Sequence, residues 1–198
     1  PRKTELVSIV VPCRNEEGFI ADCIASMLAF DLLEHIQIEV LVLDGLSEDQ
    51  TVIKLRSIME KDARVKLFTN PGKIQSTAIN IAVKEAQGEW ILRLDAHSTC
   101  PQNYLKLCYG TMLQTGADNV GGIVISTASN NRYGANLVQA ITTHKFGVGN
   151  SGFRTGMKAG AADTVPYGFF RKSIFDTIGL FDERLVRAQD YEFNCRII

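Results

Sequence analysis

The stretch of sequence that decides the fold is LVSIVVP at residues 6–12, followed by helix-spaced apolar residues between Phe19 and Leu28. The β-branched run predicts a buried strand, and we expect Pro12 to end it because proline cannot continue a central strand. The apolar residues that follow recur at helical spacing, which predicts a helix with one buried face. A strand followed directly by an amphipathic helix is the first part of a βαβ unit.

The same alternation repeats along the first half of the chain. Three more apolar runs and two more helix-spaced stretches follow, at residues 40–43, 65–68 and 90–94 and at residues 52–59 and 74–82. Ser47 and Asp49 are the candidates to cap the first of these helices. Strands that alternate with helices of about 10–15 residues predict a parallel sheet with right-handed crossovers. The expected fold class is therefore α/β, with a Rossmann-like, mostly parallel sheet flanked by helices.

The second half of the chain is less regular. Its predicted elements are a helix at residues 102–114, a strand at 120–126, a glycine-rich loop at 145–163, a strand at 164–170 and a helix at 172–178. A long loop in a compact domain commonly serves function, so residues 145–163 are a candidate part of a binding site. The last residues read as helix up to Ile198, and we therefore expect the chain to be part of a longer protein.

The composition limits the classes of function. The chain has 198 residues, of which 45% are hydrophobic and 22% charged, and this excludes a disordered, collagen-like or coiled-coil protein. With 21 Lys and Arg against 22 Asp and Glu, the net charge of -1 argues against a protein that binds nucleic acid by neutralising its phosphates. Five cysteines without a CxxC pair, no signal peptide and no apolar run of about 18 residues predict a cytoplasmic protein with reduced thiols.

Three polar turns follow predicted strands. They read PCRNE at residues 12–16, DGLSED at residues 44–49 and DAH at residues 95–97. Because ligands bind outside the carboxyl ends of the strands in an open α/β sheet, the three turns together predict one ligand site. Each turn by itself is better explained by residues that favour turns and helix caps.

Two polar segments, the turn at residues 95–97 and the segment around Asp190, suggest chemistry. Asp95 and His97, two residues apart on a turn, can face one divalent ion, and oxygen with a single imidazole suits Mn²⁺ or Mg²⁺ better than structural zinc. The alternative is that His97 forms a local hydrogen bond and caps the next helix. Asp190 begins the last helical segment and can act as a general base on a hydroxyl. The alternative is an acidic residue stabilised by the helix dipole.

Residues 147–152 spell GVGNSG, which matches the dinucleotide-binding pattern GxGxxG. That pattern requires a strand before it and a helix after it, and the flanking sequence predicts neither. We interpret these glycines as part of a mobile active-site loop in which Lys145, Arg154 and Lys158 can approach phosphate; a surface loop with solvated charges is the alternative. The sequence contains no P-loop and no GxSxG motif.

Several stretches match a known family in content and in order. They are VSIVVPCRNEE at 7–17, DGLSEDQT at 44–51, NPGK at 70–73 with Asn80, GEWI at 88–91, DAH at 95–97, YGFFR at 167–171, GLFDE at 179–183 and QDYE at 189–192. Nearly the whole chain thus resembles the inverting GT-A enzymes of glycosyltransferase family 2. The DAH turn, together with FGVGNS at 146–151 and ADTVPYG at 162–168, looks most like the succinoglycan-biosynthesis ExoA-like branch.

The resemblance implies a GT-A fold and a set of functional residues. Residues 1–97 would bind a nucleotide sugar, and a smaller half, residues 98–198, would bind the acceptor. The residues implied at the nucleotide site are Pro12, Arg14, Glu16, Asp44, Lys73 and Asp95. Asp95 and His97, which takes the place of the last Asp in the DxD motif of the family, would hold Mn²⁺ or Mg²⁺ with the diphosphate. Asp190 would be the base on the acceptor hydroxyl, and Arg93 would support Asp95.

The implied partners are a nucleotide-sugar donor, expected to be a UDP-sugar, and a saccharide or lipid-linked acceptor of polysaccharide biosynthesis. Nucleic acid is not expected as a partner. The expected location is cytoplasmic, at the inner membrane if segments outside the given sequence anchor the protein. A non-catalytic domain that binds nucleotide sugars is the alternative, and Asp190 argues against it because a binding protein needs no base there. An NAD-dependent oxidoreductase is disfavoured because no glycine fingerprint follows the first strand.

Overall fold

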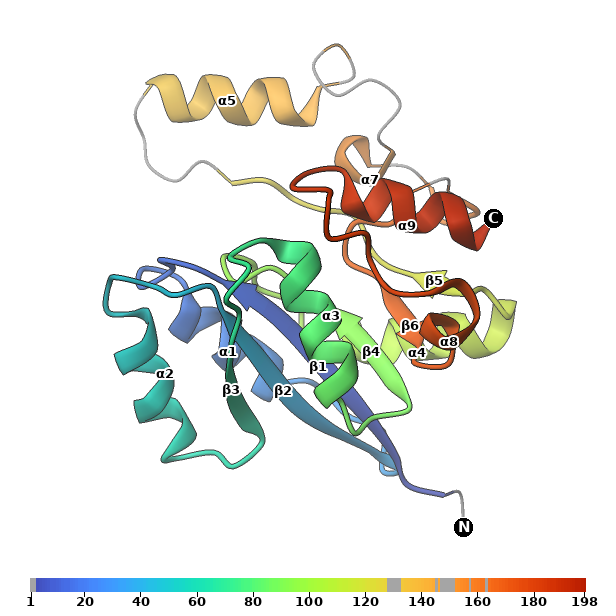
Figure 1. The fold of residues 1–198 in the computed structure, drawn as a ribbon. Coiled ribbons are helices and arrows are strands. Elements are labelled where there is room, and N and C mark those ends of the chain that lie inside the picture. The colour runs from blue at the N-terminus through green and yellow to red at the C-terminus, as the bar shows by residue number, and fades with distance from the viewer. Residues whose placement is uncertain (1–2, 128–132, 145, 147–151, 157, 163) are drawn as a thin grey trace.

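The computed structural model describes residues 3–127, 133–144, 146, 152–156, 158–162 and 164–198 (Figure 1). Its strands are β1 (Glu5–Cys13), β2 (Ile36–Asp44), β3 (Val65–Thr69), β4 (Trp90–Arg93), β5 (Asn119–Val120) and β6 (Phe169–Arg171). Its helices are α1 (Ile20–Leu28), α2 (Thr51–Met59), α3 (Gln75–Glu85), α4 (Tyr104–Thr115), α5 (Tyr133–Thr143), α7 (Gly152–Thr155), α8 (Ile174–Ile178) and α9 (Gln189–Ile197).

One sheet runs through the molecule in the order β3-β2-β1-β4-β6-β5. The first four strands in this order pair in parallel, whereas β6 is antiparallel to both β4 and β5. The prediction of an α/β fold with a mostly parallel sheet is therefore confirmed. Since β6 belongs to the second half of the chain and pairs with β4 of the first half, both halves contribute to the same sheet. The division into functional halves at residue 97 stays a prediction.

The first strand continues through Pro12, so the prediction that it ends there is wrong. Pro12 pairs in register with Leu43 of β2. On the opposite side, β4 ends at Arg93, and the backbone N–H of Leu94 donates to the carbonyl of Val10 at 3.0 Å. Residues two apart in a strand face the same neighbour, so the N–H that Pro12 lacks would point beyond the end of β4. Proline is tolerated there because no ladder hydrogen bond is lost.

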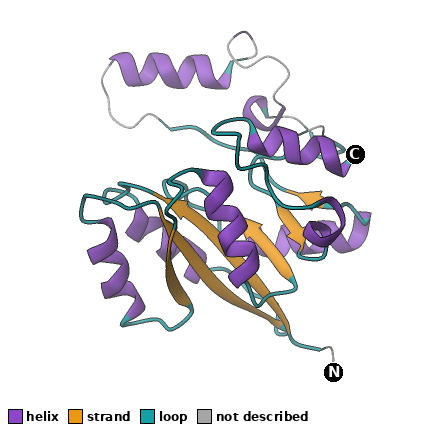
Figure 2. Cartoon of the chain, in the orientation of Figure 1, coloured by secondary structure: helices purple, strands orange, loops and turns teal. Residues whose placement is uncertain are grey.

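Helices cover both faces of the sheet (Figures 1 and 2). Helices α1, α2 and α4 pack on the face where Val7, Ile9 and Val11 of β1 are buried. Helix α3, with the phenylalanines of α8 and α9, packs on the opposite face, where Val10 is buried. Successive residues of β1 thus enter different layers of core, as the alternation of a strand requires. A strand buried on both faces reads as a nearly continuous apolar run, which is the pattern of residues 6–11 apart from Ser8.

The structure corrects several predictions for the second half. The strand expected at 120–126 ends at Val120, because Val120 pairs with Phe169, which is the first residue of β6. The strand expected at 164–170 is the short β6, and the segment expected to be a loop contains α7. Helix α5 was not predicted; it lies away from the sheet at the top of Figure 1.

Two further predictions concern segments of the second half and the membrane. The first five residues of the GVGNSG pattern, together with Lys145, lie outside the described residues. Among the helices that the structure describes, none is both long and apolar enough to cross a membrane.

Candidate active site

The carboxyl ends of the parallel strands lie at one edge of the sheet and are joined by backbone hydrogen bonds. The N–H of Gly45 donates to the carbonyl of Cys13 at 2.8 Å, and the N–H of Asn70 donates to the carbonyl of Asp44 at 2.7 Å. The turns after β1, β2 and β3 therefore lie side by side, as expected from the parallel order. The register of the sheet, rather than any side-chain contact, sets this arrangement.

The turns after β1 and β2 are also connected through side chains. The N–H of Asn15 donates to Ser47 Oγ at 2.9 Å, and Asn15 Oδ1 accepts from the N–H of Glu48 at 2.8 Å. Asn15 has φ 55°, a left-handed conformation that Asn tolerates better than most residues. The prediction that Ser47 or Asp49 caps α2 is wrong, because the N-cap is Gln50 and no side chain in the described part of the chain caps the helix. Asp49 instead accepts the N–H of Thr51 at 2.9 Å, and Ser47 binds the neighbouring turn.

The predicted nucleotide-site residues on these turns differ in exposure. Asp44 is buried at the end of β2 and accepts the N–H of Ser47 at 3.3 Å and 3.1 Å on its two oxygens. Pro12 is buried within β1, and Arg14 is exposed with its guanidinium 3.9 Å from Glu48. Lys73 is exposed in the turn before α3, where its φ of 61° is also left-handed.

Asp95 is the centre of a dense group of polar contacts. Its Oδ1 lies 2.7 Å from Arg93 Nη2 and accepts a hydrogen bond from Gln75 Nε2 at 3.1 Å. Its Oδ2 accepts a hydrogen bond from the Tyr167 hydroxyl at 3.0 Å. Burial, and next the charge of Asp95, raise the pKa of Tyr167 above its usual range, so the hydroxyl keeps the proton that it donates. These donors hold the carboxylate of Asp95 in one orientation.

One ring nitrogen of His97 contacts Glu16, and the other faces Asp95. Its Nδ1 lies 3.1 Å from Glu16 Oε1, and its Nε2 lies 3.9 Å from Asp95 Oδ2. A carboxylate can only accept, so Glu16 requires the proton on Nδ1 and leaves the lone pair of neutral His97 on Nε2. A histidine that ligates a metal is typically oriented by such a carboxylate.

A divalent ion could therefore be held by Asp95 Oδ2 and His97 Nε2. Within the described part of the chain, no group of three or more His, Cys, Asp and Glu side chains is arranged to hold a metal ion. The remaining ligands would have to come from water or from substrate.

Asp190 lies across Arg93 from Asp95. Its Oδ2 is 3.7 Å from Arg93 Nη1, and the same nitrogen donates to the carbonyl of Pro166 at 2.6 Å. Burial raises the pKa of Asp190 above its ordinary value, the charge of Arg93 partly offsets this effect, and the charge of Asp95 adds to it. The side chain of Arg93 is only 4% exposed, and its guanidinium lies 5.2 Å from the centre of the Tyr167 ring. A buried cation thus stands between the two predicted functional carboxylates.

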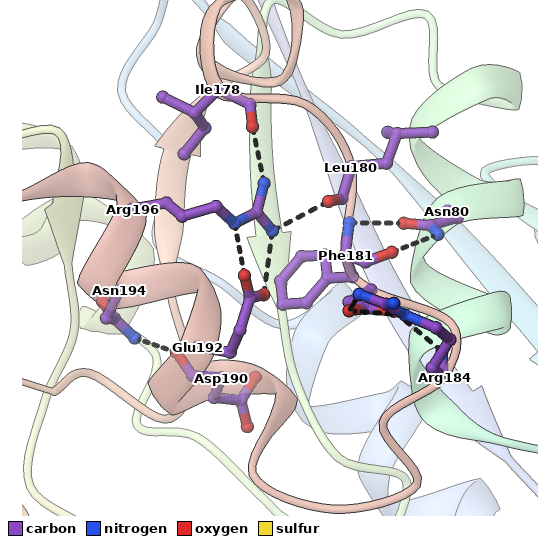
Figure 3. Close-up of polar contacts among 10 residues, drawn as sticks. Asn80, Ile178, Leu180, Phe181, Arg184, Asp190, Glu192, Asn194 and Arg196 are labelled. Carbon is purple, nitrogen blue, oxygen red and sulfur yellow. Dashed lines mark hydrogen bonds and ion pairs between the residues drawn. The ribbon is translucent and has the colours of Figure 1, made fainter.

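Helix α9, which carries Asp190, is held by side-chain contacts (Figure 3). Asn194 Nδ2 donates to the carbonyl of Asp190 at 2.6 Å, and Arg196 donates to the carbonyl of Leu180 at 2.8 Å. Asn80 of α3 binds the preceding loop through both the N–H and the carbonyl of Phe181, each at 2.9 Å. Helix α9 is therefore tied both to its own loop and, through that loop, to α3.

Arg154 and Lys158, which were predicted to approach phosphate, are more exposed than Arg93. Arg154 lies on α7, with its guanidinium 5.4 Å from the centre of the Phe153 ring, and its charge acts to lower the pKa of Tyr167. Lys158 is exposed.

Gln75 contacts Asp95 but was not among the site residues expected from the sequence. A polar residue that begins a helix directly after a strand-end turn was the available signal, because such a position lies at the carboxyl edge of the sheet.

The family sequence model described as "Glycosyl transferase family 2" matches residues 8–179. The chain belongs to glycosyltransferase family 2. Among curated family members, the succinoglycan biosynthesis protein ExoA of Rhizobium meliloti (strain 1021) is 32% identical over 191 residues. The match covers 96% of this chain but 57% of that relative, so the chain spans less than two thirds of the relative's length. The predicted family and branch are thus confirmed.

Solved structures show the same fold. The mannosyltransferase PcManGT from Pyrobaculum calidifontis, in complex with GDP-Man and Mn²⁺, matches with a TM-score of 0.72 and 19% identity, covering 99% of this chain and 52% of that one. TarS 1–349 of S. aureus, in complex with UDP-GlcNAc, matches with a TM-score of 0.66 and 20% identity, covering 96% of this chain and 52% of that one. These likenesses confirm the predicted GT-A glycosyltransferase fold.

Proposed function

We propose that this chain transfers a sugar, with inversion, from a UDP-sugar to a saccharide or lipid-linked acceptor in polysaccharide biosynthesis. The observation that carries the proposal is the arrangement around Arg93. Asp95, at the end of a parallel strand, lies 2.7 Å from one of its nitrogens, and Asp190, at the start of α9, lies 3.7 Å from another. A transferase of this kind needs one group that binds the donor diphosphate and a second group that activates the acceptor.

The donor would bind at the carboxyl edge of the sheet. In this proposal Asp44 binds the base or ribose, while Pro12, Arg14, Glu16 and Lys73 line the nucleotide site. The relation of Glu16, His97 and Asp95 suits a divalent ion such as Mn²⁺ or Mg²⁺, since Nε2 of His97 and Oδ2 of Asp95 face each other at 3.9 Å. When bound, such an ion supplies positive charge that stabilises the diphosphate leaving group.

Asp190 would accept the proton of the acceptor hydroxyl. Its pKa is raised by burial, and a base with a pKa closer to the working pH takes up a proton more effectively. Arg93 opposes the effect of burial and so favours the ionised form that a base requires. A base acting on the face opposite the leaving group gives inversion at the sugar carbon. A non-catalytic binding domain would not need this carboxylate.

The relatives support the choice of substrate class. TarS has been solved with UDP-GlcNAc and PcManGT with GDP-Man and Mn²⁺, and ExoA is a succinoglycan biosynthesis protein. We propose that residues 1–97 serve the donor and residues 98–198 the acceptor. The proposed location is the cytoplasm, with any membrane association provided by segments outside the given sequence.

The test is calorimetric titration of the chain with UDP, GDP and dTDP, each with and without Mn²⁺. We expect UDP to bind in the presence of Mn²⁺, and Asp95→Asn to abolish that binding. Asp176→Asn is the matched control. Asp176 is an exposed carboxylate on α8, and α8 follows the antiparallel strand β6, so it lies at the end of the sheet opposite the carboxyl ends of the parallel strands. Metal-dependent binding of GDP instead would change the donor class, and no binding of any nucleotide would contradict the proposal.

A further inference from the structure

Two glutamines connect the predicted donor side to the predicted acceptor side. Gln75 is the first residue of α3, and Gln189 is the first residue of α9. Gln189 Nε2 donates to Gln75 Oε1 at 2.6 Å, although the two residues are far apart in the sequence. Gln75 Nε2 in turn donates to Asp95 Oδ1 at 3.1 Å. A chain of two hydrogen bonds therefore runs from Asp95 to the residue beside Asp190.

This chain of contacts closes into a ring through Arg93. Asp95 Oδ1 contacts Arg93 Nη2, Arg93 Nη1 faces Asp190, and the backbone joins Asp190 to Gln189. The start of α9 is thus held to the end of β4 at two points, one ionic and one through neutral amides. At 3.7 Å, the ion pair between Arg93 and Asp190 is too long to be a hydrogen bond, so it does not by itself fix the orientation of the Asp190 carboxylate. The amide bridge supplies the second fixed point.

The donors and acceptors along the amide bridge, which is the pair of hydrogen bonds that links Gln189, Gln75 and Asp95, have only one possible order. The carboxylate of Asp95 can only accept hydrogen bonds, so the side-chain amide of Gln75 must present Nε2 to it. Its Oε1 then faces Gln189, and position 189 must supply a donor. Gln189 is 5% exposed, so water is a poor substitute for that donor. The carboxylate of Asp95 therefore requires a hydrogen-bond donor at position 189, next to the proposed base Asp190.

We propose that Gln75 and Gln189 are positioning residues that set Asp190 against the donor-binding carboxylate Asp95. This inference rests on the proposed function for the roles of the two carboxylates. Asp190 must face the acceptor oxygen within hydrogen-bond reach, and displacement of such a group by about 1 Å can reduce a rate by about 10²-fold. Ala188, just before the bridge, has φ 60°, so the chain enters α9 through a left-handed residue that the bridge helps to hold.

The experiment compares Gln189→Leu, Gln189→Glu, Gln75→Leu and the double variant Gln75→Leu/Gln189→Leu. Gln114→Leu is the matched control, because Gln114 is exposed near the end of α4. The first readout is release of UDP from UDP-GlcNAc with Mn²⁺, in which water takes the place of the acceptor hydroxyl; GDP-mannose is the second donor. The second readout is the dissociation constant of the nucleotide, and the third is the unfolding equilibrium in urea.

We expect both Gln189 variants to lower kcat at least about tenfold, with the nucleotide dissociation constant within about twofold of the unaltered chain. Gln189→Glu should do no better than Gln189→Leu, because a carboxylate cannot donate to Gln75. The double variant should be no slower than Gln75→Leu. In urea, the two single Leu variants should show a coupling of about fivefold in the unfolding equilibrium constant. Gln114→Leu should change neither kcat nor nucleotide binding.

Normal kcat in Gln189→Glu, or effects of the single variants that multiply in the double variant, would overturn the inference. The inference would also be overturned if Gln75→Leu and Gln189→Leu changed the unfolding equilibrium constant independently of each other. This outcome counts whether or not the chain binds nucleotide. Failure of the proposed function has a different signature, since the unaltered chain would then bind no nucleotide while the coupling in urea was still measured.

Discussion

The predicted donor side and acceptor side of this member of glycosyltransferase family 2 are built by different means. Asp44 and Asp95 come at or just after the ends of β2 and β4, and main-chain pairing with β1 places them. Asp190 begins a helix that follows a long irregular segment, and side chains place it: Asn194 within α9, Asn80 on the preceding loop and Gln75 at Gln189. A single substitution should therefore disturb the acceptor side more than the donor side, because each side-chain contact there has no main-chain ladder behind it.

The largest effect should come from Asp190→Asn. Because Asn cannot accept a proton, we expect the release of UDP from UDP-GlcNAc to fall by roughly 10²–10⁴-fold, the range for loss of a general base. Calorimetric binding of UDP with Mn²⁺ should stay unchanged, which separates the acceptor side from the donor side. Equal loss of rate in the control Asp176→Asn, or loss of UDP binding in Asp190→Asn, would argue against this division.

Arg93→Met should disturb both sides at once. It removes the buried cation between Asp95 and Asp190 and leaves two carboxylates without their common partner. We expect a loss of about 3 kcal/mol in the free energy of unfolding in urea, the lower end for breaking a buried ion pair. Arg93→Lys should recover part of this loss in unfolding free energy. Lysine restores the positive charge but has a single nitrogen, so it cannot contact Asp95 and Asp190 through two separate nitrogens. A loss below about 1 kcal/mol would mean that the cation is replaceable.

Asn80→Leu tests the dependence of the acceptor side on one side chain. Asn80 is buried and makes hydrogen bonds to the N–H and carbonyl of Phe181 and to Glu183 Oε1. Leu would leave the backbone of Phe181 buried without these partners, so we expect a loss of about 2–3 kcal/mol in unfolding free energy. The nucleotide dissociation constant should stay unchanged, because the substitution does not touch the ends of β1 and β2, where the nucleotide is proposed to bind.

The pH dependence should carry the signature of Asp190. Its pKa is raised in the folded chain, so the rate should increase with pH through a value above 3.8, the ordinary value for Asp. The folded chain binds this proton more tightly than the unfolded chain does. The resulting stabilisation is complete below about 3.8 and is lost as the pH rises through the folded-state pKa. Urea titrations at several pH values should show this loss in the unaltered chain and not in Asp190→Asn.

The smallest effect should come from Thr51→Val on the donor side. Thr51 is buried and accepts the N–H of Glu16 at 2.8 Å, so Val removes one hydrogen bond with little change of shape. We expect a loss of about 1 kcal/mol in urea, because the neighbouring turn contacts of Asn15 and Ser47 persist. A loss as large as that of Asn80→Leu would remove the proposed difference between the two sides.

The sequence predicted the parallel half well because its signal is local. Alternating strands and helices with few long insertions restrict the sheet to a few topologies, and Asp44, Asp95 and His97 lie at or just after the ends of their strands. The errors have physical causes as well. Pro12 was expected to end a strand because the sequence does not reveal that β4 stops at Arg93. Residues 121–126 were expected to continue a strand, but β6, the strand that would pair with them, begins at Phe169, which already pairs with Val120.

The family of this protein, its α/β class and the identity of its candidate carboxylates were determined by the sequence alone, since each depends on residue types at short spacing. Arg93 was expected to support Asp95 from the sequence, but the other partners at the site were decided only by the tertiary structure. Arg93 beside Asp190, Glu16 on His97, and Gln75 on Gln189 are contacts between residues on different elements. No local pattern encodes such contacts, because they depend on the three-dimensional placement of α3 and α9 against the end of β4.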